Sequence, residues 1–390
     1  MSASTEKKLR AQARAEGTDK KTVAAQKEAE KRKKVNTWKI LALIFIILAA
    51  AVIIFVNTDI RYHATTALTV GDRNYSPAEV NYQFGSEYQE FLSNYGDYAS
   101  LFGLDTSTGM VGLASQECMY TDGGTWRDYF KDNAITALKQ TQAMLKYAAE
   151  NGIELTDDEK AEIETQLGSY DTYAASNGYN DVDRFIAAVY GRGVNKDIVR
   201  TMLNDAYLAS KAYTDHSGKI EVTDAQVKEE YPSVAVRHIL VKAEANEDGE
   251  YTEEALAAAK TKAEEILAEY EDGDKTEESF AALAEKYSED EGSNTNGGLY
   301  SNIHSGDTVE EFDAFCFDPA RKTGDTGIVF GDNGSYQGYH VMYFVGEGDP
   351  STDDTGRSRI RSEILSAWVE DITTGVEVVE QKAMKLVGKG

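Results

Sequence analysis

The pattern of hydrophobic and polar positions divides the chain into three regions of different character. Residues 40–56 form an apolar run without a charge or a helix breaker. The stretch that follows, up to residue 231, carries apolar residues at helical spacing, which predicts an all-α assembly. Its helices are expected at 79–95, 126–150, 156–167, 181–190, 195–213 and 223–231. From residue 232 on, the pattern changes to that of a small α/β domain.

Two of these helices begin with specific capping signals. Ser76 is expected as an N-cap with Pro77 at the first helical position. Thr156 is followed by Glu159 three residues later, which is the spacing of a capping box. The Gly/Ser/Thr-rich stretch 102–124 interrupts the helical pattern and is expected to be a loop or insertion.

The α/β region is bracketed by two of the four prolines, Pro232 and Pro350. Its expected elements are a strand at 234–242, helices at 252–270 and 276–287, a Gly/Asn-rich loop at 288–298, a short helix near 309–317 and a strand at 339–346. Past Pro350, residues 357–372 return to an amphipathic helix, which cannot bury its apolar face alone. We expect it to dock on the helices before Pro232, so that the α/β region is an insertion.

The first strand of this region, 234-VAVRHILVK-242, contains a histidine in an otherwise apolar run. Val236, His238 and Leu240 would share one face, and the other face is equally apolar, which predicts a strand covered on both sides. Taken alone, a histidine at such a position is more often an inert core residue than a functional one.

The apolar run at 40–56 is long enough to be considered as a membrane-spanning helix. Its seventeen residues span about 25 Å as a helix, near the short limit for crossing a bilayer. The basic cluster 31-KRKK-34 precedes it, so we expect a cytoplasmic tail at 1–37, a single transmembrane helix at 38–57 and an extracytoplasmic body in the cell membrane. A cleaved signal peptide is the alternative.

Charge is strongly segregated along the chain. Residues 1–39 carry 12 Lys+Arg against 5 Asp+Glu, whereas the rest carries 28 against 62. Such an acidic body argues against nucleic acid or anionic lipid as its partner and favours basic or neutral client chains. The two cysteines, Cys118 and Cys316, match no metal or CxxC spacing, so no disulfide framework is expected, although a bridge between them stays open.

Three features of the α/β region occur together in a recognisable order. They are His238 on the first strand, the polar loop 287-YSEDEGSNTNGG-298, and His340 in 338-GYHVMYFV-345. With 237-RHILVK-242 and 306-GDTVEEFDAFCF-317, the segment from about 233 to 347 resembles the parvulin-type peptidyl-prolyl cis-trans isomerases. The flanking helices and the anchor look like the chaperone part of foldases of the PrsA and SurA type.

The resemblance implies roles for individual residues. His238 and His340 match the paired histidines of the family, and Asp290 falls where the family has Cys or Asp, so these three are the expected catalytic residues. The expected substrate-binding residues are Leu299, Thr308, Phe312 and Phe317, of which the two phenylalanines match the wall that receives the proline ring. Rotation about an amide bond needs no nucleophile, and no cofactor or metal is expected.

The resemblance also implies an α+β architecture. It has the single N-terminal transmembrane helix, a SurA-like α-helical chaperone domain and an inserted parvulin-like α/β domain with a small sheet. The expected domains are 58–231 for the chaperone part, 232–348 for the isomerase and 349–390 for the C-terminal helix that packs on the chaperone domain. The implied function is isomerisation of X–Pro bonds in unfolded or partly folded exported polypeptides, with the bilayer contacted through 38–57 and a homodimer left open.

Some residues depart from the family pattern, and they leave alternatives open. Thr308 stands where Met or Leu normally packs against the proline ring, and the loop exit reads 297-GGLYSN-302. A holdase with an inactive isomerase fold is therefore one alternative, and a tyrosine-rich surface binding protein is another. Asp290 alone would more often be a turn or cap residue, and Phe312 and Phe317 could be plain core.

Overall fold

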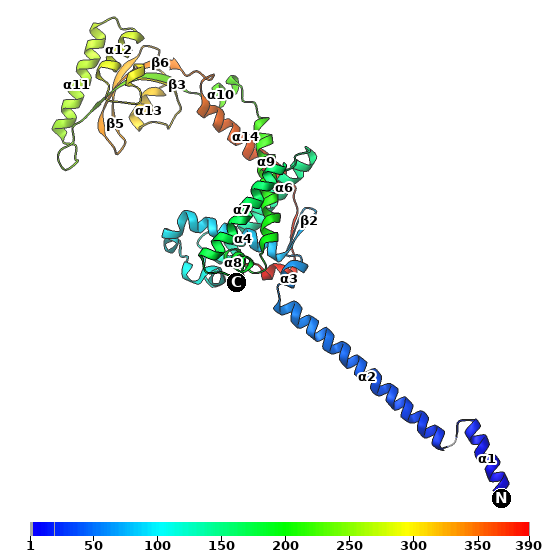
Figure 1. The fold of residues 1–390 in the computed structure, drawn as a ribbon. Helices are drawn as coiled ribbons and strands as arrows, with labels where there is room; N and C mark the ends of the chain where they lie inside the picture. The colour runs from blue at the N-terminus through cyan, green and yellow to red at the C-terminus, as the bar shows by residue number, and fades with distance from the viewer. Residues whose placement is uncertain (1–2, 19, 390) are drawn as a thin grey trace. The chain divides into compact units, whose positions relative to one another are not determined.

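The structure is a computed structural model that describes residues 3–18 and 20–389. The chain forms two compact units (Figure 1). The first unit consists of the residues up to Ala212 together with the segment from Thr373 on, and the second is Tyr213–Ile372. The limits predicted for the chaperone, isomerase and C-terminal segments divide the chain differently and stay a prediction.

The first unit is mainly helical, in agreement with its apolar spacing. Its helices are α1 (Ala3–Ala15), α2 (Lys20–Asn57), α3 (Ile60–Ala64), α4 (Pro77–Tyr95), α5 (Gly109–Gly112), α6 (Trp126–Glu150), α7 (Asp157–Ser176), α8 (Val182–Tyr190) and α9 (Lys196–Gly218). Short 3₁₀ turns at Gly96–Phe102, Thr106–Thr108 and Leu113–Ser115 lie between α4 and α6. Both predicted caps are confirmed, because Ser76 with Glu79 and Thr156 with Glu159 form capping boxes at α4 and α7.

Helix α2 contains the apolar run. Its segment Lys31–Val56 has a mean hydropathy of 3.1 and is long and apolar enough to cross a membrane. None of the residues in its most apolar stretch is buried by the protein. The length and composition expected of a spanning helix are therefore present.

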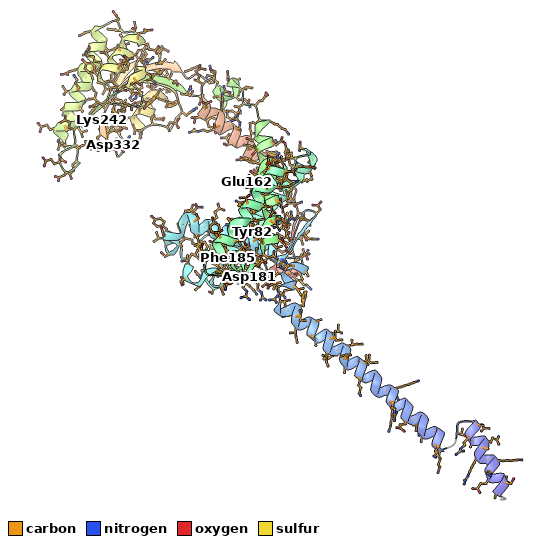
Figure 2. All side chains as sticks on the ribbon, in the orientation of Figure 1. Tyr82, Glu162, Asp181, Phe185, Lys242 and Asp332 are labelled. Carbon is orange, nitrogen blue, oxygen red and sulfur yellow. The ribbon has the colours of Figure 1, made fainter. Side chains whose placement is uncertain are left out.

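The chain's C-terminal segment completes the first unit. Strands β1 (Leu68–Val70), β2 (Arg73–Tyr75) and β7 (Val378–Glu380) form an antiparallel sheet in the order β2-β1-β7. Met384 and Val387, from beyond β7, are buried in the same core as Trp126. The aromatic residues Tyr82 and Phe185, labelled in Figure 2, belong to a smaller cluster around α7 and α8.

The second unit contains a four-stranded antiparallel sheet. Its elements are α10 (Asp224–Glu230), β3 (Val234–Lys242), α11 (Glu253–Asp272), α12 (Glu277–Tyr287), β4 (Leu299–Ile303), α13 (Glu310–Cys316), β5 (Thr326–Asp332), β6 (Gln337–Glu347) and α14 (Asp354–Thr374). The strand order is β4-β3-β6-β5. Sequence pattern predicted β3 and β6 but missed the edge strands β4 and β5, since β4 is short and partly polar and β5 contains two glycines.

Strand β3 lies inside this sheet with both faces covered, as predicted. Ile239 and Val241 pack with α11 and α12 in one buried cluster. Val236, on the opposite face, packs with Phe312 of α13 in another. His238 points to the same side as Val236, so the face that carries the histidine is the one that α13 partly covers (Figure 1).

Helix α14 contacts helices that precede strand β3 along the chain. The Arg357 guanidinium donates to the Val222 carbonyl at 2.8 Å and pairs with Asp224 of α10. The indole of Trp368 stacks on the His216 ring, with centroids 3.9 Å apart. These contacts hold α14 against α10 and the end of α9 within the second unit.

The polar loop after α12 approaches the backbone of β3 closely. The His238 amide donates to the Gly298 carbonyl at 2.9 Å. Gly297 and Gly298 both have φ of +71°, and a Cβ at Gly298 would lie 2.2 Å from the His238 carbonyl oxygen. Both positions therefore favour glycine because of their left-handed backbone conformation, and Gly298 also leaves no room for a Cβ atom.

We predict that Gly298→Ala destabilises the second unit by about 3 kcal/mol or more, because the new methyl group collides with β3 and the residue is left-handed. Gly249→Ala is the matched control, since Gly249 has φ of +81° in open space and should lose only about 1 kcal/mol. Scanning calorimetry of both variants measures the difference. Equal losses would contradict the close approach.

Candidate active site

Two histidines from neighbouring strands meet on the face of the sheet beside α13. His238 lies opposite Met342, and His340 lies opposite Leu240, so the two histidines are diagonal neighbours across β3 and β6. Their Nδ1 atoms are 3.0 Å apart, and the residues are only 2% and 4% exposed. The strand register thus produces a hydrogen-bonded pair of almost fully buried imidazoles.

A carboxylate from the polar loop completes the arrangement. Asp290 Oδ2 lies 3.0 Å from His238 Nε2. The hydroxyls of Ser293 and Tyr300 donate to the same oxygen, and the Tyr300 ring stacks on His238 with centroids 4.8 Å apart. Asp290 Oδ2 is therefore held by three side-chain donors, which is more than a turn or cap role requires.

These contacts perturb the protonation equilibria of the site. The hydrogen bond from His238 holds the pKa of the Asp290 carboxyl far below its usual range, against the opposing effect of burial. Burial, and then the nearby His238, lower the pKa of His340 to about 3. Burial raises the pKa of Tyr300 to about 12. At neutral pH the site therefore holds an ionised Asp290, a neutral His340 and an un-ionised Tyr300.

The ionised Asp290 fixes which ring nitrogens donate and which accept along the chain of hydrogen bonds that joins it to His238, His340 and Tyr336. Since Asp290 can only accept, His238 Nε2 carries a proton, and in the neutral tautomer of His238 the Nδ1 atom is an acceptor. His340 must then donate from Nδ1, which leaves its Nε2 to accept from the Tyr336 hydroxyl at 2.9 Å. All donors in this chain point toward Asp290, so each bond polarises the next.

A cavity of about 400 Å³ opens beside the histidines. It is lined by His238, Leu240, Asp290, Tyr300, Asp307, Thr308, Val309, Phe312, Asn333, Tyr336 and His340. The Phe312 ring stands edge-on to both imidazoles, with centroids 5.5 and 5.2 Å away. The Thr308 hydroxyl is buried and has no hydrogen-bond partner among the described residues. The cavity combines one aromatic wall with a polar floor.

The predicted site residues do not all reach this cavity. His238, Asp290, His340, Thr308 and Phe312 line it together. Leu299 and Phe317 are not among its lining residues within the part of the chain that the structure describes.

Leu299 instead begins β4, where it pairs with Arg237. Phe317 packs beneath the site with the cluster around Val236, at the C-terminal end of α13. A substrate-binding role for these two residues has no support from the cavity itself.

The short turn before β6 contributes to the cavity as well. Lys242 and Asp332, labelled in Figure 2, are the last residues of β3 and β5, and the turn 333–336 lies at that end of the sheet. Asn333 and Tyr336 of this turn line the cavity. The Gln337 amide donates to Asp332 across the turn at 2.9 Å.

The loop 304–309 forms another wall and is tied to α14. His304 Nε2 lies 3.1 Å from Asp353 Oδ2, and both residues are almost fully buried. The backbone amide of His304 donates to Asp307 at 3.0 Å, and the guanidinium of Arg359 binds the other oxygen of the same carboxylate at 3.2 Å. The loop that supplies Asp307 and Thr308 to the cavity is therefore positioned from outside the sheet.

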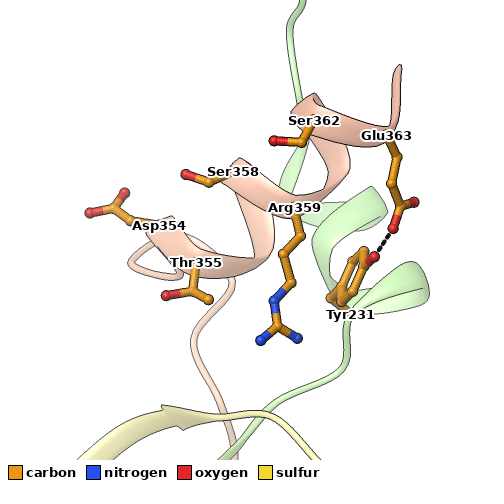
Figure 3. A pocket seen from close by; sticks show the side chains of 7 residues that line it. All are labelled: Tyr231, Asp354, Thr355, Ser358, Arg359, Ser362 and Glu363. Carbon is orange, nitrogen blue, oxygen red and sulfur yellow. Dashed lines mark hydrogen bonds between the residues drawn. The ribbon is translucent and has the colours of Figure 1, made fainter. Parts of the chain in front are cut away.

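Figure 3 shows the α14 side of this connection. Arg359 projects from α14 beside Tyr231, and its guanidinium carbon lies 5.7 Å from the centre of the Tyr231 ring. The Tyr231 hydroxyl donates to Glu363 one turn further along the helix. A second cavity, of about 570 Å³, lies between these side chains.

Sequence reasoning missed several functional side chains. Ser293, Tyr300 and Tyr336 bond directly to the catalytic candidates, yet they lie in turns or on a strand that the pattern did not predict. Nothing in the composition of the segment 331–336 places Tyr336 next to His340. Ser293 does lie within the recognisable loop and Tyr300 directly after it, so their position near Asp290 in the sequence was the available signal.

Comparison with known proteins agrees with this geometry. Residues 222–343 match the family described as the PPIC-type PPIase domain. The foldase protein PrsA 3 of Bacillus cereus is 35% identical over 156 residues, which is 40% of this chain and 46% of that protein. The foldase protein PrsA of Levilactobacillus brevis is 23% identical over 300 residues, 75% of this chain and 89% of that protein.

A solved structure of the foldase protein PrsA from Streptococcus pneumoniae aligns over 68% of this chain and 96% of that chain, with 19% identity and a TM-score of 0.29. The fold, the site and the family match define the second unit as carrying a parvulin-type peptidyl-prolyl cis-trans isomerase domain. The chain is similar to PrsA foldases over 40% of its length in one of these matches and over 75% in the other. The resemblance inferred from the sequence is thereby confirmed.

The low pKa of His340 predicts a specific loss of stability in acid. In the unfolded chain this imidazole binds a proton near pH 6.5, whereas in the folded chain it stays unprotonated until about pH 3. Lowering the pH from 7 to 5 therefore favours the unfolded state by about 2 kcal/mol through this residue. Urea unfolding of His340→Gln should show a correspondingly smaller loss than the unmodified chain. His63→Gln, at an exposed position, is the control, and an unchanged pH dependence in His340→Gln would contradict the assignment.

The connection from α14 predicts an effect on substrate binding at a distance. Arg359→Ala should raise KM for a prolyl peptide about two- to fivefold with little change in kcat, because the loop that carries Asp307 and Thr308 loses one of its attachments. Arg361→Ala on the same helix removes the same charge and is the control. Equal kinetics for the two variants would show that the ion pair does not position the loop.

Proposed function

We propose that the protein is a membrane-anchored foldase that isomerises X–Pro bonds in polypeptides outside the cytoplasmic membrane. His238, His340 and Asp290 are the proposed catalytic residues, Phe312 and Thr308 contact the proline, and the helical part holds the client chain. The observation that carries the proposal is the bonded His340–His238–Asp290 chain on the floor of a cavity with an aromatic wall.

The physical basis is a stabilised twisted amide. The peptide bond has a rotational barrier of about 18–20 kcal/mol, which reflects its resonance. A proline ring held against Phe312 in a water-poor cavity leaves the amide free to twist. Polar groups that favour the twisted form over the planar one then lower the barrier. The buried, hydrogen-bonded histidines offer such groups without any covalent step.

The localisation rests on α2 and on the charge of the tail. A helix long and apolar enough to span a bilayer follows the cluster 31-KRKK-34, which favours a cytoplasmic N-terminus and an extracytoplasmic body. Lipid contact through 38–57 and a single crossing are part of this proposal, as are the exported clients.

A protease-coupled assay on prolyl tetrapeptides tests the enzymatic part. The fragment 57–390 should accelerate cis–trans exchange, and His238→Ala or Asp290→Ala should reduce kcat/KM at least about tenfold. His63→Ala is the matched control, since this histidine is exposed and distant in sequence from the site. An unchanged rate in both site variants would refute the assignment of catalytic residues.

A holdase without isomerase activity is the second candidate. The partnerless Thr308 hydroxyl in the cavity wall and the bond of Tyr336 to His340 make this cavity more polar than a proline ring prefers. Suppression of client aggregation with no isomerisation above background would favour this reading over the enzyme.

A further inference from the structure

The segment 96–124 of the first unit is anchored to the core and yet leaves large apolar side chains exposed. It is drawn in cyan in Figure 1 and lies between α4 and α6. Leu104, Leu113 and Cys118 are buried in the core that contains Trp126. These three anchors hold the segment in place, so the exposure of its other apolar residues is a property of the folded unit.

Four aromatic rings form a continuous row across this segment. Tyr95 and Phe102 have ring centroids 5.8 Å apart, Phe102 and Tyr120 are 6.1 Å apart, and Tyr120 and Tyr129 are 5.6 Å apart. We call these four residues the aromatic ridge. Trp126 packs beneath it, with its ring 5.9 Å from that of Tyr120. The rings are therefore fixed in position by the core on which they rest.

The ridge is accessible. Tyr95 is 49% exposed and Tyr120 is 51% exposed, and Leu101 beside them reaches 75%. A groove of about 520 Å³, lined in part by Leu104 and Asp105, lies in the same segment. Clustered apolar side chains at an accessible surface are characteristic of interaction sites.

The stretch of sequence that carries three of the four ridge residues, Tyr95, Phe102 and Tyr120, has charge of a single sign. Residues 80–126 contain no Lys, Arg or His. The acidic residues of this stretch are Glu87, Glu90, Asp97, Asp105, Glu117 and Asp122. The next cation along the chain, Arg127, turns its guanidinium to the carbonyl of Val387 at 2.9 Å. The exposed Tyr95 and Tyr120 thus belong to a stretch of sequence whose only charged side chains are carboxylates.

We propose that the aromatic ridge binds an extended cationic segment of an unfolded polypeptide, in which Lys or Arg recurs among large apolar residues. This rests on the proposed foldase function and assigns the class of client segment to one surface. Tyrosine faces accept cations, the surrounding carboxylates attract them, and the apolar ridge accepts aliphatic and aromatic side chains.

The charge argues against two other occupants. A second copy of this chain, meeting the ridge through the same face, would bring two acidic surfaces together. An anionic lipid surface would be repelled for the same reason. A basic client is the partner whose charge complements this surface.

Fluorescence anisotropy tests the proposal with the full chain in phosphatidylcholine nanodiscs. The probe is a labelled proline-free peptide in which Lys and Phe recur among Gly and Ser, so that proline binding at the isomerase site is not measured. The unmodified protein should bind this peptide more tightly than its Glu-for-Lys counterpart, with an affinity that falls as salt rises. Equal binding of the two peptides would overturn the proposal.

Two variants separate the aromatic and electrostatic contributions. Tyr95→Ser with Tyr120→Ser should weaken peptide binding about fivefold or more. Asp97→Asn with Glu117→Gln and Asp122→Asn keeps the apolar surface and should abolish the preference for Lys over Glu. Tyr173→Ser with Glu154→Gln, exposed residues of the same unit outside the segment, is the matched control.

The outcomes distinguish this inference from the proposed function. If both ridge variants bind the peptide within twofold of the unmodified protein while aggregation suppression persists, the ridge assignment is wrong and the foldase proposal stands. If the unmodified protein neither binds the peptide nor suppresses aggregation, the chaperone part of the proposed function fails. Self-association that is lost in the tyrosine variant would identify a second copy as the occupant and overturn the proposal.

Discussion

The hydrogen bond between the Nδ1 atoms of His238 and His340 is the interaction on which the site depends. It forms only if one ring donates and the other accepts, which requires opposite protonation at the two Nδ1 atoms. Burial keeps His340 neutral, and Asp290 fixes the proton on Nε2 of His238. The diagonal register of β3 and β6, and the glycines that let the polar loop approach β3, are the structural conditions for this bond.

The polar chain extends further than the three residues that motif reasoning identifies. Tyr336 donates at one end, and Ser293 and Tyr300 donate to the carboxylate at the other. Each buried side-chain nitrogen or oxygen in this series of hydrogen bonds has a partner, so the site avoids the cost of unsatisfied groups. Among the residues that the structure describes, the buried Thr308 hydroxyl in the cavity wall has no partner, which makes it available to a bound peptide.

Charged residues are distributed unevenly along the chain, and this distribution bears on its exposed apolar surface. The tail before the apolar helix is basic, and the rest of the chain has more than twice as many acidic as basic residues. Within the first unit, Tyr95, Phe102 and Tyr120 of the aromatic ridge lie in the stretch 80–126, which has carboxylates and no cation. An excess of carboxylates keeps a protein with an exposed apolar surface soluble. In the proposal made above, the same carboxylates make the aromatic ridge prefer cationic client segments to anionic ones.

The sequence by itself determined the class of domain, the order of its elements and the residues at its centre. Apolar spacing predicted the long helices and the two central strands, because periodicity reports directly on burial. Motif order identified His238, Asp290 and His340, and composition separated the tail, the apolar helix and the acidic body. Tertiary structure alone decided which side chains share the cavity: it includes Tyr300 and Tyr336 and leaves Leu299 and Phe317 elsewhere. It also decided that α14 holds the loop 304–309 and that Tyr95 and Tyr120 stay exposed, since contacts between residues far apart in sequence leave no periodic signal in the chain.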